Sequence, residues 1–120
     1  MAAPADLARG DVVRVSLDPV QGSETAGERP ALVISSAFIN LHSPVVLVAA
    51  LTSRKVEKVY PFEALLNPPE GGLKMPSKAL LMQLRSVDKQ RIIGRMGKVA
   101  PASMDRINEA LKIATGLTDI

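Results

Sequence analysis

The sequence has no cysteine and no tryptophan, and it has a single histidine, His42. A disulfide scaffold, a zinc–thiolate site and a cysteine nucleophile are therefore excluded. One imidazole cannot build a zinc site within a single chain, and it cannot form a two-histidine acid–base pair. We expect His42 to be an exposed loop residue beside Pro44, and we expect a chain that works without a metal or another cofactor.

Aromatic side chains are scarce, since the chain has only Phe38, Tyr60 and Phe62. Proteins that hold single-stranded nucleic acids mainly by stacking need several exposed rings, so that class is excluded. The formal net charge is +3. This mild excess permits a polyanionic partner without requiring one. Such a partner would have to be bound by charge and hydrogen bonds.

Long hydrophobic runs are missing as well. The longest run, Val45 to Leu51, is far shorter than the roughly 18 residues of a membrane span. The first residues predict no secretory signal, which favours a cytoplasmic protein. No glycine-rich phosphate loop of either common pattern occurs. With 120 residues of ordinary composition, the chain is expected to be a single domain, 1–120.

What is present is a series of short strand patterns. Val13, Val15 and Leu17 alternate with polar residues, which is typical of a half-buried strand. A polar stretch over 18–28 predicts an exposed loop, and residues 36–42 suit either one helical turn or an irregular crossover. The predicted strands, with Pro61 interrupting two of them, are 11–17, 31–35, 45–52, 56–60, 62–66, 77–84 and 92–99.

The C-terminal segment predicts a helix. Pro101 suits its first turn because a proline lacks the N–H that would be unpaired there. Asp105 is expected in the first turn and Gly116 at the left-handed cap. The apolar face has helical spacing and comprises Met104, Ile107, Leu111 and Ala114. Many short strands with one terminal helix predict a mostly β fold, a small barrel.

Several motifs together resemble the MazF/PemK family of toxins. They are RGD at 9–11, LDP at 17–19, GSE at 22–24, GERPALVIS at 27–35, LTS at 51–53, YPFE at 60–63 and QLRSVDKQR at 83–91. The resemblance covers most of the chain in order. It implies a small SH3-like (CcdB/PemK-like) barrel with a C-terminal helix, usually a homodimer. It also implies sequence-specific cleavage of single-stranded RNA, such as mRNA, and an antitoxin whose acidic, partly disordered tail covers the RNA groove.

Cleavage of RNA without a cofactor uses the substrate's own 2′-hydroxyl as the nucleophile. The enzyme must help to remove its proton, neutralise charge on the phosphate and protonate the leaving 5′-oxygen. The expected products are a 2′,3′-cyclic phosphate and a 5′-hydroxyl end, and DNA should survive.

Three residues are the catalytic candidates that the resemblance implies. The Arg29 guanidinium can hold a phosphate through two hydrogen bonds. Because an arginine side chain is a poor base, we favour electrostatic stabilisation over a role as base. Thr52 ends a predicted strand and can donate its hydroxyl to a phosphate oxygen. Glu24 is the candidate base, with Glu28 as its competitor, although both also suit solvated loop carboxylates. Without the family motif, Arg29 would be interpreted as an ordinary surface residue.

Further residues are expected to contact RNA. The candidates are Ser23, Glu28, Ser53, Arg54, Gln83 and Arg85. The basic stretch that continues with Lys89, Arg91, Arg95 and Lys98 is also expected to bind phosphate, although a dimer interface or a solvated surface would explain some of it. Arg14 and Ala50 stand where relatives often carry an aromatic residue and a proline, which affects the recognised sequence rather than the reaction.

Two alternatives remain open at this point. A non-enzymatic toxin of the same fold could poison DNA gyrase through its last residues, 117–120. A binding module that has lost catalysis could retain only the antitoxin contact, although the presence of both Arg29 and Thr52 argues against it.

Overall fold

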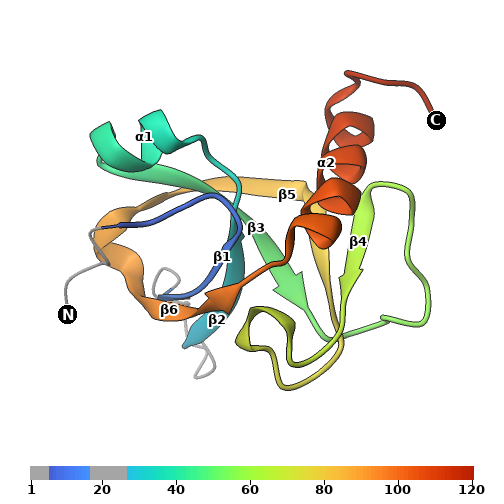
Figure 1. Cartoon of the computed structure of the whole chain (residues 1–120), viewed down its shortest axis with the longest axis horizontal. Helices are drawn as coiled ribbons and strands as arrows, with labels where there is room; N and C mark the ends of the chain where they lie inside the picture. Colours follow the sequence, from blue (N-terminus) through green and yellow to red (C-terminus); the bar gives the residue numbers. More distant parts are fainter. Residues whose placement is uncertain (1–5, 17–26) are drawn as a thin grey trace, which may run out of the picture.

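Six strands form one antiparallel sheet in the computed structural model, which describes residues 6–16 and 27–120 (Figure 1). Their order in the sheet is β4-β5-β3-β2-β1-β6. In chain order the elements are β1 (Asp11–Ser16), β2 (Glu28–Val33), α1 (Ala37–His42), β3 (Val45–Thr52), β4 (Glu63–Leu66), the 3-10 turn η1 (Glu70–Gly72), β5 (Ser77–Asp88), the 3-10 turn η2 (Lys89–Arg91), β6 (Ile92–Lys98) and α2 (Pro101–Thr115).

The sheet curls into a half-open barrel. β5 pairs with β3, whereas β6 pairs with β1 on the other side of the sheet. Because only the three residues of η2 connect β5 to β6, these two sides must approach each other, and Figure 1 shows the resulting ring. The predicted fold class, mostly β with a C-terminal helix, is confirmed.

A wide irregularity bends β5. Ala49 of β3 is paired with Leu84, but the next residue, Ala50, is paired with Leu80. The intervening residues of β5, 81–83, have no partners in this register. Such bulges bend a strand and redirect its side chains. The bend gives β5 two arms, one paired with β4 and the end of β3, and the other closing the barrel.

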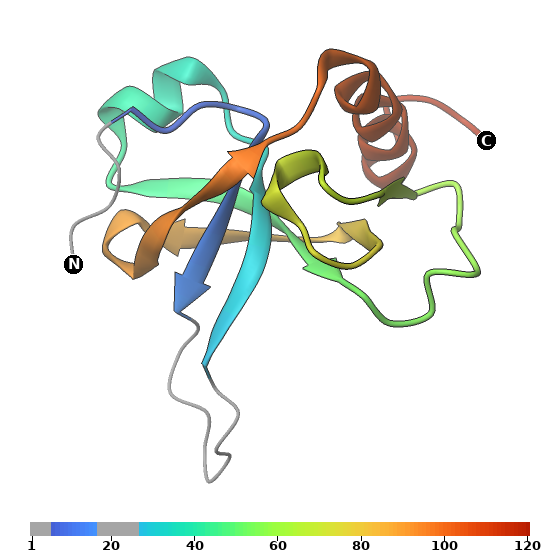
Figure 2. The same cartoon turned by 60° about the horizontal axis from the view of Figure 1, so that its bottom comes forward.

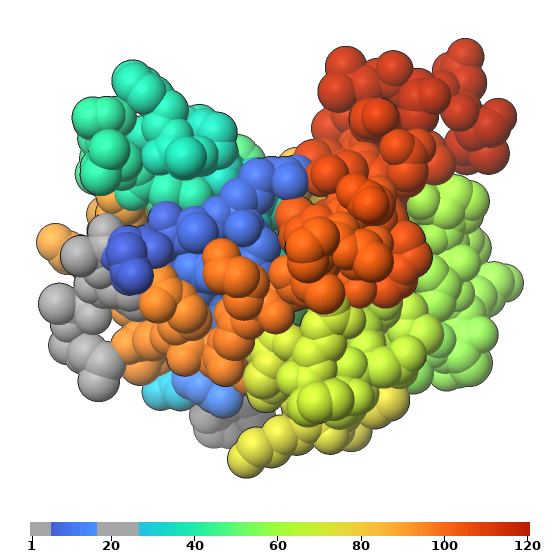
Figure 3. Space-filling view, in the orientation of Figure 1, coloured from blue at the N-terminus to red at the C-terminus, as the bar shows by residue number. Residues whose placement is uncertain are grey.

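Each face of the sheet carries its own hydrophobic core, because successive residues of a strand point to opposite faces. On β1, Val12 belongs to the core beneath α2, which also includes Ile107 of that helix. Its neighbours Val13 and Val15 belong to the core inside the barrel. Figure 3 shows α1 and α2 as separate projections with a hollow between them.

The ends of α2 are fixed by different means. Pro101 is the first helical residue and Gly116 adopts the left-handed conformation, as predicted. The prediction that Asp105 lies in the first turn of α2 was wrong. Asp105 lies beyond this turn, which contains no acidic residue. Instead, Glu70 of η1 accepts hydrogen bonds from the Ala100 N–H (2.9 Å) and the Ser103 hydroxyl (3.0 Å). A carboxylate from another part of the chain thus caps this helix.

The turn η1 lies against β6 at very close range (Figure 2). A Cβ atom on Gly72 would lie 2.2 Å from the Met96 carbonyl oxygen, and Gly72 also has a φ of +72°. A side chain there would clash with backbone, so glycine is required. This contact carries η1, and with it Glu70, to the start of α2.

Most predicted strands are confirmed, and one prediction was wrong. β3 has the predicted bounds, and residues 36–42 contain the helix α1, so His42 ends a helix rather than lying in a loop. Residue 17, the predicted end of the first strand, lies outside the described residues. Residues 56–60 form no strand, because the chain turns through 54–57 with Lys55 at a positive φ and Val59 and Tyr60 stay exposed.

No helix in the described part of the chain is long and apolar enough to cross a membrane.

Candidate active site

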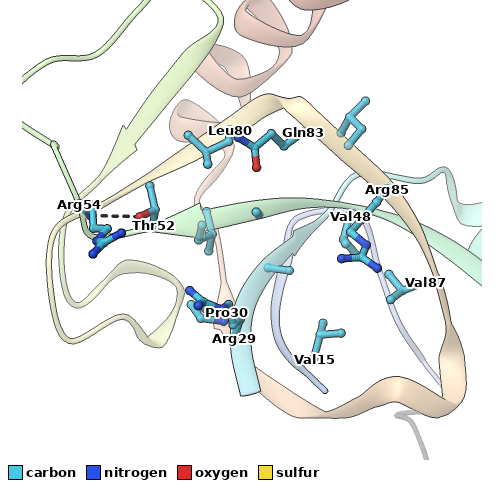
Figure 4. Close-up of a pocket in the computed structure, with 14 residues that line it drawn as sticks. Val15, Arg29, Pro30, Val48, Thr52, Arg54, Leu80, Gln83, Arg85 and Val87 are labelled. Carbon is cyan, nitrogen blue, oxygen red and sulfur yellow. Dashed lines mark hydrogen bonds between the residues drawn. The ribbon is translucent and has the colours of Figure 1, made fainter. Parts of the chain in front are cut away.

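Two adjacent pockets lie where β2 begins and β3 ends. The first has a volume of about 520 Å³ and is walled by β1, β2, β3 and β5 (Figure 4). The second has a volume of about 770 Å³ and extends toward η1 and the segment that follows it. Both pockets are lined by Arg29, Thr52 and Arg54. We call these three residues the ridge, because they form the boundary that the pockets share.

Arg29 lies on β2, opposite Val15 of β1 in the sheet register. Its neighbours in the strand direct alternate side chains into the barrel, so the backbone beneath this arginine is rigid. The Arg29 guanidinium has no hydrogen bond or ion pair with any other described residue. An exposed, uncompensated guanidinium on a fixed strand is suited to a bidentate contact with phosphate.

Thr52 is the last residue of β3 and is half-buried. Its Oγ1 accepts a hydrogen bond from the Arg54 backbone N–H at 3.1 Å, drawn as the dashed line in Figure 4. This contact holds the threonine as an acceptor and leaves its hydroxyl proton available to a ligand. Ser53, the next residue, lines only the second pocket.

Gln83 and Arg85 reach the first pocket from the bent strand β5. Gln83 lies in the unpaired segment 81–83, and its side chain points into the pocket, as does that of Arg85 (Figure 4). The bend therefore places a carboxamide and a guanidinium opposite the ridge. Sequence reasoning placed both residues near RNA through the family resemblance, and the structure brings them together with Arg29 and Thr52.

Of the two carboxylate candidates, the structure describes only Glu28. Glu24 and Ser23 lie outside the described residues. Glu28 lines neither pocket, and its Oε1 lies 3.6 Å from the Arg14 Nε, with both side chains partly exposed. Among the described residues, no group of three or more histidine, cysteine, aspartate or glutamate side chains is arranged to hold a metal.

Part of the predicted basic stretch has a structural role instead. The Asp11 carboxylate is buried and lies 3.0 Å from Arg95 Nε and 3.3 Å from Lys98 Nζ, and Arg95 also contacts Asp6. We call Asp6, Asp11, Arg95 and Lys98 the β1–β6 seam. Arg95 and Lys98 line neither pocket. A phosphate contact by these two cations stays a prediction, and the structure shows them paired with carboxylates.

Hydrogen bonding in the seam shifts two pKa values. The Arg95 guanidinium donates a hydrogen bond to the Asp6 carboxylate and holds the pKa of Asp6 below its ordinary value. The same hydrogen bond raises the pKa of Arg95. One oxygen of Asp11, Oδ1, has no hydrogen bond of good geometry, but the Lys98 ammonium compensates its charge. Both shifts favour the charged forms of Asp6 and Arg95.

Of the residues that line only the second pocket, sequence reasoning named Ser53 and missed others. The missed residues include Arg14 on β1 and Lys74 and Met75 after η1. Arg14 was noted only as a departure from the family pattern, and the structure brings it to the site by pairing it with Pro30, beside Arg29. Nothing in the local sequence around Lys74 indicates a site, because the turn η1 brings it there.

A curled antiparallel sheet that presents arginines without described partners and a hydroxyl at its strand ends defines a small barrel protein with a candidate anion-binding site. Residues 8–115 match the family model described as PemK-like, MazF-like toxin of type II toxin–antitoxin system. The chain belongs to this family of toxins.

Similar proteins agree with this assignment. The chain is 38% identical to endoribonuclease MazF9 of Mycobacterium tuberculosis (89% of this chain, 94% of the relative) and 38% identical to endoribonuclease EndoA of Bacillus subtilis (92% and 96%). An endoribonuclease from a mycobacterial species, solved in complex with its cognate antitoxin, superposes with a TM-score of 0.78 at 25% identity over 95% of this chain and 99% of that one. These relatives place the chain among the endoribonucleases of its family.

Proposed function

We propose that this toxin cuts single-stranded RNA at specific sequences, mRNA included, by activating the substrate's own 2′-hydroxyl. The observation that carries the proposal is the ridge, where the Arg29 guanidinium and the Thr52 hydroxyl line the same two pockets. A phosphate on the ridge meets two kinds of donor held on rigid strands. Pockets on either side of it leave room for the nucleotides that flank the cut.

The reaction forms a bond from the 2′-oxygen to phosphorus and breaks the bond from phosphorus to the 5′-oxygen. Negative charge builds on the non-bridging oxygens, where Arg29 and Thr52 donate hydrogen bonds. Fixed donors lower the barrier because they need no reorganisation as the charge develops. The products are a 2′,3′-cyclic phosphate and a 5′-hydroxyl end.

Two protons also move during this reaction. The 2′-hydroxyl proton leaves to a base, for which Glu24 is our candidate, while Glu28 is engaged with Arg14. The leaving 5′-oxygen takes a proton from Arg29 or from water; an arginine that donates is regenerated quickly because its conjugate base is strong. No step in this scheme uses a metal or an organic cofactor.

The partners follow from the same surface. Arg54, Gln83 and Arg85, with Ser53 and Ser23, are proposed to contact the RNA. An antitoxin with an acidic, partly disordered tail would compete for these cations, and the structure of one similar endoribonuclease is a complex with its cognate antitoxin. We propose a homodimer that acts in the cytoplasm. Gyrase poisoning through residues 117–120 is not favoured, because the curated relatives are endoribonucleases.

The test is incubation of the purified protein with a long unstructured RNA and with DNA of the same sequence, both in EDTA. We expect cuts at a few defined sites in RNA alone, with 5′-hydroxyl ends when the fragments are mapped. RNA that stays intact, or 5′-phosphate ends, would contradict the proposed chemistry. Cutting that requires added divalent metal would contradict the cofactor-free step.

A further inference from the structure

Among the residues that the structure describes, the second pocket carries charge of one sign only. Its described lining includes Arg14, Arg29, Arg54 and Lys74, and no aspartate or glutamate. Apart from Arg14, none of these cations has a hydrogen bond or ion pair from its side chain to another described residue. In the first pocket, by contrast, Arg85 is the only described cation beyond those it shares. An uncompensated cluster of this kind attracts a polyanion.

The floor of the second pocket is apolar. Met75, which is 58% exposed, and Met96 line it beside Leu73. Methionine side chains are flexible and polarizable, so they adapt to flat groups of different outline. An exposed methionine and a partly buried one next to cations suit a nucleotide, whose base is apolar on its faces and whose phosphate is charged.

The position of this pocket relative to the ridge sets its role. Both pockets touch Arg29 and Thr52, so a phosphate bound by these residues has one pocket on each side. Building on the cleavage function proposed above, we propose that the second pocket is a nucleotide subsite next to the cut. Lys74 and Arg14 bind the next backbone phosphate there, and the two methionines contact its base.

Glu28 gains a role of its own in this arrangement. Its carboxylate lies 3.6 Å from Arg14 in an exposed pair, and exposed pairs are weak. An incoming phosphate displaces this carboxylate from Arg14. Glu28 therefore acts as a competitor of RNA at the subsite rather than as a group that binds it.

The experiment measures binding without cutting. The probe is a short fluorescent single-stranded RNA that spans a mapped cleavage site and carries a 2′-deoxy sugar at the cut, and anisotropy is recorded over a range of salt. Lys74→Ala is expected to weaken binding about tenfold, as for one lost charge-assisted contact. It should also reduce the slope of log affinity against log salt by about 0.7, the value for one phosphate of a single strand.

The matched control is Lys112→Ala, an exposed lysine on α2 that pairs with Glu109. It removes the same charge away from both pockets, so affinity and salt slope should stay at the wild-type values. Melting by circular dichroism should be equal in both variants, because Lys74 and Lys112 are exposed. A purely global charge effect would lower the slope in both variants and would overturn the subsite.

Two further arms locate the contact. Removing nucleotides one at a time from each end of the probe should weaken wild-type binding at the step that vacates the subsite, and Lys74→Ala should not respond to that step. Glu28→Gln should tighten binding about two- to threefold, the size of an exposed ion pair, and should have no effect in an Arg14→Ala background.

The outcomes separate this inference from the proposed function. Cleavage by the wild type with unchanged RNA affinity of Lys74→Ala overturns the subsite and leaves the proposed function intact. Where the wild type cuts no RNA, a mixed-sequence single-stranded RNA replaces the mapped probe. Equal binding of that RNA by wild type and Lys74→Ala, or no binding at all, overturns the subsite in that case too.

Discussion

The ridge and the β1–β6 seam both concentrate positively charged side chains. In the seam these side chains are paired with carboxylates, whereas on the ridge they have no partner among the described residues. In the seam, Arg95 and Lys98 lie within 3.3 Å of carboxylate oxygens, and the carboxylate at the centre, Asp11, is buried. On the ridge, Arg29 and Arg54 have no side-chain partner among the described residues. A cation that is paired with a carboxylate stabilises the fold, whereas an unpaired cation on a rigid strand is available to a ligand. The amino-acid composition alone cannot distinguish paired from unpaired cations.

The sharpest test of this contrast is Arg29→Ala. It removes a donor to the phosphate in the transition state, and loss of one such donor typically lowers kcat by about 10²- to 10³-fold. Stability should change by less than about 0.5 kcal/mol, because the side chain is exposed and unpaired. Single-turnover cleavage of RNA and thermal melting measure the two effects. A variant that melts early but cuts normally would place Arg29 with the structural cations instead.

The next largest effect is expected at a buried ion pair outside both pockets. Lys78 Nζ lies 2.9 Å from Glu63 Oε1, and the two side chains are only 7% and 9% exposed. Glu63→Gln leaves the ammonium buried without its counter-charge, which costs about 3 kcal/mol. Urea unfolding gives the free energy. The same change in the exposed pair of Lys112 and Glu109, Glu109→Gln, should cost less than about 0.5 kcal/mol. Equal losses of unfolding free energy in the two variants would show that burial does not determine how much an ion pair stabilises this protein.

The seam itself is tested by Arg95→Ala. This change leaves Asp11 with Lys98 as its remaining cation and should destabilise the protein by about 2 kcal/mol. Cleavage per folded molecule should stay within about twofold of wild type, as for an ordinary change outside the site, because Arg95 lines neither pocket. Urea unfolding and single-turnover cleavage at low temperature measure the two quantities. A large loss of cleavage in a fully folded variant would indicate that Arg95 contacts the RNA.

These contrasts also explain how much could be predicted from the sequence. Residues 45–52 contain the longest apolar run and a polar turn follows them, so the bounds of β3 were predicted. Gly116 and Pro101 carry local capping signals, so the ends of α2 were predicted too. Residues 56–60 have an apolar pattern but little to pack against, and the strand expected there does not form.

The rest depends on contacts between distant parts of the chain. Arg95 meets Asp11 from 84 positions away, and Glu70 caps α2 from 30 positions before Ala100. The bend of β5 that directs Gln83 into the first pocket follows from a register shift against β3. No local pattern distinguishes Lys98, which is paired, from Lys74, whose side chain has no ion pair or hydrogen bond with another described residue. The family resemblance identified Arg29 and Thr52, whereas the second pocket required the folded chain.

The smallest effect is expected at the exposed end of the seam, where pH provides the test. The Arg95 hydrogen bond holds the pKa of Asp6 below its ordinary value of 3.8, so the folded state binds this proton less readily than the unfolded state does. The resulting stabilisation is complete above the unfolded pKa and is lost as the pH falls through the lower, folded pKa. Asp6→Asn should therefore be slightly less stable than wild type at pH 7, and this difference should vanish in strong acid. The measurement is urea unfolding of both proteins across the acid range. A stability difference that stays constant with pH would mean that Asp6 contributes through packing rather than through its charge. Asp11 would then be the only carboxylate of the seam that stabilises the protein by its charge.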